Sequence, residues 1–155
     1  MELDDKAWHL MAALQADARA PLKTLAQAAG LSVPATVERL RRLQEAGVVR
    51  GFHAHIDPLA VGYGVRAMVG IHAPQPGKKA LLEKLAQSPE VLECHHVAGN
   101  DSYQMLVVAT DLQDLERFLS DINRWGETRT SIIFSTPIER RGVARKIQGK
   151  LDSYA

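Results

Sequence analysis

The sequence contains one cysteine and almost equal numbers of positive and negative residues. A single cysteine, Cys94, cannot form a disulfide framework within one chain or a cysteine-rich zinc site, so we expect a small buried apolar residue there. The 19 Lys and Arg residues are balanced by 18 Asp and Glu residues, which leaves a formal net charge of +1. Proteins that coat nucleic acid without sequence preference carry a large positive excess. Any contact with DNA must therefore be local.

The sequence also predicts neither a membrane span nor a leader segment. No apolar run is long enough to cross a bilayer, and the acidic start Met1-Glu2-Leu3-Asp4-Asp5 lacks the basic region of a signal peptide. We therefore expect a cytoplasmic protein with no membrane partner. The sequence offers no nucleophile paired with a base, no phosphate-binding glycine loop and no metal-ligand set, which predicts no enzymatic activity, no cofactor and no metal.

Apolar spacing predicts three helices in the first fifty residues. A stripe at i, i+3, i+4 and i+7 follows Asp4 and predicts a helix to about residue 17, and the same spacing returns over residues 22–29. Gly30 stands where a helix end favours a left-handed residue, Ser32 can cap the next helix, and Pro34 lies in its first turn. Two helices joined by so short a bend favour a helix-turn-helix.

The third predicted helix has an apolar side and a polar side when residues 33–46 are wound at about 100° per residue. The expected packing residues are Val33, Val37, Leu40 and Leu43. The expected outward residues are Ala35, Glu38, Arg39, Arg42 and Glu45. Because the N-terminal half of a recognition helix enters the major groove, Arg39 is the expected base-reading residue, with two donors for guanine. The alternative is an ordinary solvated helix, since arginine is common on exposed faces.

The remaining contacts predicted in this half are to phosphates. Arg41 and Arg42 are expected to hold the DNA backbone. Alternating polarity over residues 48–57 predicts a strand that forms a wing and leaves Arg50 near a neighbouring phosphate. The complete predicted DNA-binding set is Ser32, Pro34, Ala35, Glu38, Arg39, Arg41, Arg42 and Arg50.

Beyond a connector that ends at Gly64, strand and helix patterns alternate in the order βαββαβ. The expected strands cover residues 65–72, 91–98, 103–109 and 128–136, with one helix around residues 81–88 and another from a capping box at Thr110 and Gln113. This order is ferredoxin-like, with two helices on one side of a four-stranded antiparallel sheet. The other side stays open and partly apolar, so we expect a dimer.

The predicted fold class is thus α+β. A winged helix-turn-helix DNA-binding domain is expected at residues 1–60, a ferredoxin-like ligand-binding and oligomerisation domain at residues 61–140, and a C-terminal tail at residues 141–155.

This combination resembles the Lrp/AsnC family of feast/famine transcriptional regulators. The resemblance rests on the run Leu31–Leu43, on Gly47–Phe52 and on Glu93–Gly99, and it spans residues 3–139. It implies a sequence-specific regulator that binds double-stranded DNA, has a RAM-type second domain, and assembles as a dimer or as an octamer. It further implies an amino acid effector bound between dimers.

The family's effector site lies at the turn between the second and third strands. The commonest family version of that turn is Gly-Asp-any-Asp-Tyr, whereas Asn100 and Ser102 replace the two acids here. Turn N–H groups can hold a carboxylate, and Asp101 or Asn100 can meet an ammonium group. A plain hairpin turn is the alternative, because turns use these residue types anyway. The predicted effector-binding residues are Gly99, Asn100, Asp101, Ser102, Tyr103 and Ser135.

A second function class fits the same elements. A metabolite-sensing protein whose winged helix binds a partner protein rather than DNA would share this fold, because winged helices serve both uses. Failure to bind any genomic DNA would favour it.

Overall fold

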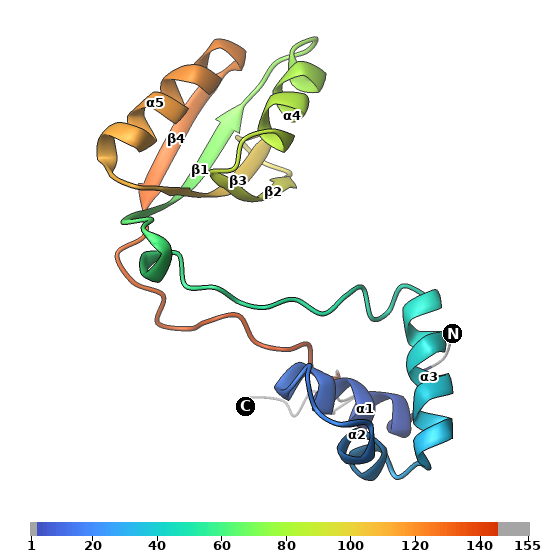
Figure 1. Cartoon of the computed structure of the whole chain (residues 1–155). Coiled ribbons are helices and arrows are strands. Elements are labelled where there is room, and N and C mark those ends of the chain that lie inside the picture. The colour runs from blue at the N-terminus through green and yellow to red at the C-terminus, as the bar shows by residue number, and fades with distance from the viewer. Residues whose placement is uncertain (1–2, 146–155) are drawn as a thin grey trace, which may run out of the picture. The chain divides into compact units, whose positions relative to one another are not determined.

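The computed structural model describes residues 3–145, which form two compact units. The first unit contains the residues up to 54 together with the segment that starts at Glu139, and the second spans His55–Ile138. Three helices are followed by a βαββαβ unit, which confirms the α+β class (Figure 1). No helix within the described residues is long and apolar enough to cross a membrane.

The first unit is a bundle of three helices whose ends follow from local signals. The carboxylate of Asp4 accepts a hydrogen bond from the N–H of Ala7 at 2.8 Å and caps the first helix. Gly30 has a left-handed φ of 62° directly after the second helix, where any side chain would strain the backbone. The three helices are α1 Asp5–Ala16, α2 Leu22–Ala29 and α3 Val33–Glu45.

The apolar stripes of these three helices meet in one core. α1 supplies most of it, and α2 and α3 close it from two sides. The buried members are Ala7, Leu10, Met11, Leu14, Leu25, Ala29 and Leu43. Because this core buries one side of α3, the rotation of α3 about its own axis is fixed, and so is the set of side chains that it presents to solvent.

The prediction of a wing strand over residues 48–57 is wrong. Residues 50–57 have no regular secondary structure and are exposed, including Phe52 at 45% and Ile56 at 59%. An alternating pattern indicates only that a segment can be a strand, because a strand also needs a neighbour to share its N–H and C=O groups. No other part of the described chain pairs with this segment.

The second unit has the predicted ferredoxin-like topology. Its four strands are antiparallel wherever they pair and lie in the order β2-β3-β1-β4. The 3₁₀ turn η1 Leu59–Val61 precedes the sheet, and η2 Asn123–Trp125 precedes the last strand. The main elements are β1 Val65–His72, α4 Lys78–Ala86, β2 Val91–His96, β3 Tyr103–Ala109, α5 Leu112–Ile122 and β4 Glu127–Ile132.

Both helices of this unit cover the same face of the sheet (Figure 1). Alternate residues of the two central strands point into the core they form, for example Val69 of β1 and its register partner Met105 of β3, both fully buried. Leu81 of α4 and Phe118 and Ile122 of α5 pack against them. The opposite face, which carries Met68, Gly70 and their register partners, is not covered by either helix.

Several boundaries in this unit differ from the sequence prediction, and β2, for example, ends at His96 rather than at residue 98. β4 ends at Ile132 rather than at residue 136; its register with β1 ends where Ile132 faces Ala67, and one further hydrogen bond joins the N–H of Ile133 to the carbonyl of Arg66. The cap of α5 is Asp111, which accepts from the N–H of Asp114, and not Thr110. Asp114 in turn accepts from the N–H and the hydroxyl of Thr110, the residue before the cap.

Candidate DNA interface and ligand site

The turn between α2 and α3 is held by backbone and hydroxyl hydrogen bonds. The N–H of Leu31 donates to the carbonyl of Ala26 after the left-handed Gly30. Ser32 then caps α3 by accepting from the N–H of Ala35 at 3.3 Å. The hydroxyl of Thr36 donates to the carbonyl of Ser32 at 2.9 Å. These bonds fix the start of α3, the part of a helix-turn-helix that lies nearest to base edges.

The buried side of α3 is rotated from the predicted one. Thr36 is fully buried and Leu43 nearly so, whereas Val33 and Val37, which were expected in the core, are 40% and 44% exposed. Burial of Thr36 is tolerated because its hydroxyl is satisfied by the Ser32 carbonyl. The Ser32 and Thr36 spacing of i and i+4 at the helix start was a signal for this arrangement, since it places the hydroxyl beside the cap residue's carbonyl.

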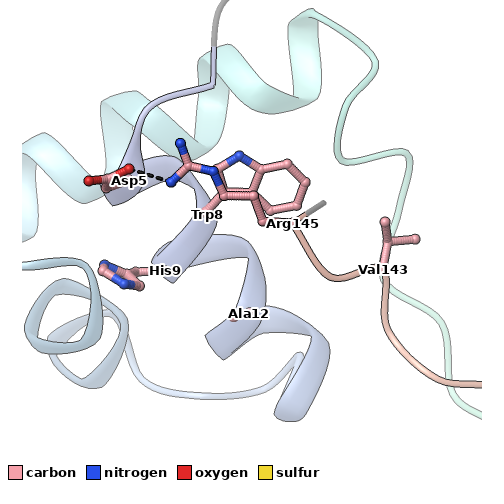
Figure 2. A pocket seen from close by; sticks show the side chains of 6 residues that line it. All are labelled: Asp5, Trp8, His9, Ala12, Val143 and Arg145. Atoms are coloured by element: carbon pink, nitrogen blue, oxygen red, sulfur yellow. Dashed lines mark hydrogen bonds and ion pairs between the residues drawn. The ribbon is translucent and has the colours of Figure 1, made fainter. Parts of the chain in front are cut away.

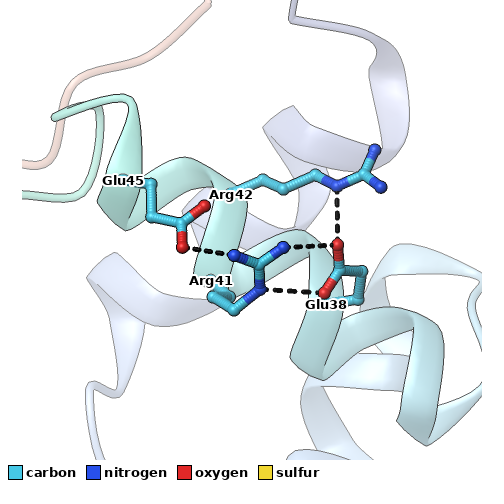
Figure 3. A network of polar contacts seen from close by, with 4 residues as sticks. All are labelled: Glu38, Arg41, Arg42 and Glu45. Carbon is cyan, nitrogen blue, oxygen red and sulfur yellow. Dashed lines mark hydrogen bonds and ion pairs between the residues drawn. The ribbon is translucent and has the colours of Figure 1, made fainter.

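Four charged residues form a closed network on the outward face of α3 (Figure 3). Glu38 accepts from Arg41 at 2.8 and 2.9 Å and from the Nε of Arg42 at 2.8 Å, and Arg41 also donates to Glu45. The two arginines hold the pKa of Glu38 at about 2, Arg41 contributing more, and the pKa of Arg41 is raised by Glu38 and Glu45. The two arginines and two glutamates of this network have no net charge together.

Arg39 lies on the flank of α3 that faces α1. Its guanidinium pairs with the carboxylate of Asp4, and its side chain is 34% exposed, compared with 67% for Arg42. The N–H of Ala7 and the Arg39 guanidinium both lower the pKa of Asp4. Arg39, expected on the outward face, is thus half-buried at the edge of that face and held by Asp4.

The other predicted DNA-binding residues are accessible. Ser32, Pro34 and Ala35 are exposed at the N-terminal end of α3. Arg50 is exposed, but in the irregular segment that replaces the predicted wing. Arg41, expected to hold the DNA backbone, has a side chain that is 54% exposed. The two exposed valines of α3 were not among the predicted DNA contacts.

On the open face of the sheet of the second unit, the candidate ligand site centres on Asp101. Arg129 of β4 donates to its Oδ1 at 2.8 Å, and the side-chain amide of Gln104 donates to its Oδ2 at 3.3 Å. The Asp101 side chain is only 12% exposed and lies over Gly70, where a Cβ would come within 2.3 Å of Oδ2. Sequence reasoning found Asp101 but missed Gln104, three residues further along, and Arg129, which only the register of β4 on β1 brings beside Asp101.

The rest of the turn is tied to the end of β1. The carbonyl of Asn100 accepts from the Nδ1 of His72 at 2.9 Å. The buried hydroxyl of Ser102 bonds both the N–H and the carbonyl of Ala73 at 3.2 Å, and the Ser102 N–H donates to Ile71. Gly99 has a φ of 136°, which a side chain would rarely adopt. Asn100 and Ser102 thus anchor the hairpin.

Tyr103 and Ser135 do not line one pocket within this chain. Tyr103 is buried, stacks against His96 at 5.2 Å between ring centroids, and pairs with Ile71 near one end of β1. Ser135 is exposed, three residues after β4 ends at the opposite end of β1. β1 also lies between β3, which carries Tyr103, and β4, which precedes Ser135.

The segment from Glu139 onward contacts α1, and Val143 and Arg145 of this segment line an open pocket together with side chains of α1 (Figure 2). The side-chain amide of Gln15 donates to the carbonyl of Val143 at 3.0 Å and accepts from its N–H at 2.6 Å. Arg145 pairs with Asp5. Part of the predicted separate tail is thus held against α1, and its residues 146–155 lie outside the described residues.

No cluster of three or more His, Cys, Asp or Glu side chains that could hold a metal is found within residues 3–145. Cys94, expected to be buried, is exposed on β2, although partial burial raises the pKa of its thiol.

Both units match known domain families. Residues 3–44 match the AsnC-type helix-turn-helix domain, and residues 66–143 match the Lrp/AsnC ligand binding domain. The transcriptional regulator LrpA of Mycobacterium tuberculosis is 41% identical over 137 residues, which cover 86% of this chain and 91% of the relative. The regulator AldR of Mycolicibacterium smegmatis is 35% identical over 140 residues, which cover 86% and 82%.

Solved structures agree over nearly the whole chain. The feast or famine regulatory protein of M. tuberculosis complexed with L-methionine has a TM-score of 0.84 and 39% identity, and the match covers 93% of this chain and all of that one. The structure of LrpA from the same organism has a TM-score of 0.75 and 40% identity, with 88% and 96% covered. The succession of the two units is therefore shared with these proteins.

Proposed function

The chain belongs to the Lrp/AsnC family of helix-turn-helix transcriptional regulators, and from this premise we propose how its own residues bind DNA and an effector. The observation that carries the DNA assignment is the outward face of α3, which begins at a capped, exposed N-terminus and carries two arginines, Arg41 and Arg42, about two turns further on. A helix with this arrangement can enter the major groove while its arginines reach the phosphates on either side.

In this proposal the exposed N-terminal half of α3 lies nearest to the bases. Ser32, Pro34 and Ala35 approach the groove, and Arg39 donates to a guanine after leaving Asp4. Arg41, Arg42 and Arg50 bind phosphates. Opening the Glu38 network costs little, because ion pairs as exposed as these contribute weakly in water and phosphates replace the lost partners.

The effector of this chain is proposed to be an amino acid or a related small molecule bound at the turn that contains Asp101. A relative with the same fold has been solved with L-methionine. The Asp101 and Arg129 pair offers opposite charges on one sheet face, and these suit the ammonium and carboxylate ends of an amino acid. Since Asp101 is already paired, a ligand must displace or share Arg129, so the affinity depends on both residues.

The protein is proposed to act in the cytoplasm as a homo-oligomer. The face of the sheet that carries Met68, which is 37% exposed, has no covering helix. A sheet face of this kind is stabilised by burial against a second copy, and a two-fold related pair of helix-turn-helix units binds two half-sites. Sedimentation of the full chain distinguishes a dimer from an octamer.

DNA selection tests the proposal directly. The full chain is incubated with fragments of its own genome and the bound fragments are sequenced, then affinities for a bound fragment and for random DNA are measured at several salt concentrations. We expect a preference of at least about a thousandfold for the selected fragment. Absence of any bound fragment would reject DNA binding and favour the rival class, a metabolite sensor whose first unit binds a partner protein.

A thermal-shift screen of the full chain against the twenty amino acids tests the effector. A ligand that binds the native state raises the unfolding midpoint by mass action. We expect at least one amino acid to raise it in the wild type and not in Arg129→Gln. A shift that persists in Arg129→Gln places the ligand elsewhere, and no shift with any amino acid contradicts an amino acid effector.

A further inference from the structure

Two valines on α3 are exposed where the sequence pattern predicts burial. Val33 is 40% and Val37 is 44% exposed, while the apolar residues one turn further along, Leu40 and Leu43, are partly or fully buried. Burying apolar side chains of this size stabilises a folded protein by about 25 cal/mol for each Å² of surface removed from water. Core packing therefore does not account for the residue type at these two positions.

The valines lie in one row along α3 with a charged residue at its end. Val33, Val37 and Arg41 follow each other at intervals of four residues, which superimposes them on the same side of a helix. Arg41 is itself exposed and can turn from Glu38 to a phosphate. The row is thus apolar at the N-terminal end, which in a docked recognition helix faces the bases, and cationic toward the other end.

We propose that Val33 and Val37 read the C5-methyl groups of thymines in the major groove, an inference that rests on the DNA binding proposed above. Thymine is the only base that presents a methyl group there, and an apolar side chain recognises it by excluding water from both surfaces. The valines select thymine at one or two positions of each half-site, next to the positions read by hydrogen bonds. Residues with amide or guanidinium groups would instead favour adenine or guanine.

The test removes one methyl group at a time from the DNA. A duplex is selected from a random pool with the full wild-type chain, and each thymine in it is replaced singly by deoxyuridine. We expect the replacement to weaken binding about fourfold at one or two thymines per half-site. This factor corresponds to about 0.8 kcal/mol, the contribution of one buried methyl or methylene group. Val37→Ala binds the thymine and deoxyuridine duplexes equally at the affected position.

A matched control separates this contact from a general loss of apolar surface. Val48 is 38% exposed but lies after the end of α3, so Val48→Ala keeps the full methyl sensitivity. Unfolding midpoints are measured for both variants, and neither is expected to change much because both side chains are exposed.

Several results would overturn the inference. One is a wild type that is insensitive at every thymine, and another is Val37→Ala that keeps the wild-type sensitivity at both thymine positions. If Val37→Ala changes the association state but not the methyl sensitivity, the valines instead cover another copy of the chain. Specific binding without methyl sensitivity leaves the proposed function standing, whereas failure to select any DNA rejects both.

Discussion

The guanidinium of Arg39 on α3 donates to the same carboxylate oxygen of Asp4 that caps α1. One oxygen thus accepts from the N–H of Ala7 inside its own helix and from a side chain thirty-five residues further along the chain. The pair links the start of the first helix to the middle of the third. It also occupies the residue that sequence reasoning selected for base recognition.

Asp4→Asn tests whether Arg39 reads a base or only holds α1 and α3 together. Asparagine still caps α1, but it no longer carries the charge that holds the guanidinium. We expect affinity for the selected duplex to rise about two- to fivefold while affinity for random DNA changes less, because Arg39 is released toward a base. Competition binding at one salt concentration measures both. Equal changes on both DNAs would assign Arg39 to holding α1 and α3 together.

Glu38→Gln frees two arginines on the outward face of α3. Glu38 accepts from both Arg41 and Arg42, whereas Glu45 accepts from Arg41 alone. We expect Glu38→Gln to bind all DNA more tightly, by about three- to tenfold at low salt, with a steeper salt dependence. Glu45→Gln is the matched control and should give a smaller gain. Weaker binding by Glu38→Gln to the selected duplex alone would show that its carboxylate reads a base.

Ser102→Ala tests whether this predicted effector residue is structural. Its buried hydroxyl bonds both backbone groups of Ala73, so its removal leaves a buried N–H without a partner. Such a loss costs about 1–3 kcal/mol, and the unfolding midpoint should fall with or without an amino acid. Ser120, exposed on α5, gives the control variant Ser120→Ala, which should be near neutral. An unchanged unfolding midpoint for Ser102→Ala would contradict the structural role and favour a role of the hydroxyl in effector binding.

Gln15→Ala should release the segment around Val143 from α1. The side-chain amide makes two hydrogen bonds to one residue of that segment, and Arg145 adds an exposed ion pair with Asp5. Because exposed ion pairs stabilise little, the amide carries most of the attachment. We expect tryptic cleavage after Arg145 to become several-fold faster. Gln27→Ala, on the exposed side of α2, controls for the loss of a glutamine, and equal cleavage rates in both variants would contradict the attachment.

Local sequence patterns predicted the structure correctly where the conformation of a segment depends on its own residues. Gly30 and Ser32 mark a helix end and a helix start by their backbone needs alone, and both are found as predicted. The alternation of β1 likewise predicted that strand and its buried face, since Val69 and Ile71 are fully buried. The βαββαβ order then left few ways to form a sheet.

Patterns failed where a second segment decides the outcome. Residues 50–57 alternate like a strand, yet a strand requires a partner and the described chain provides none. Thr36 is buried in place of Val37 because the Ser32 carbonyl satisfies its hydroxyl and the core formed by α1 and α2 sets the rotation of α3. Tyr103 and Ser135 were both predicted to bind the effector, but β1 lies between β3, which carries Tyr103, and β4, which ends before Ser135.

The sequence by itself determined the helix-turn-helix, the ferredoxin-like unit and the family resemblance, because capping, turn residues and apolar periodicity act within a few residues of chain. Tertiary structure alone decided which side chains those elements present. The packing of α1 against α3 turned Arg39 toward Asp4 and left Val33 and Val37 in solvent. The register of β4 on β1 brought Arg129 to Asp101 across twenty-eight residues. Contacts between distant segments depend on packing and register, which no local pattern encodes.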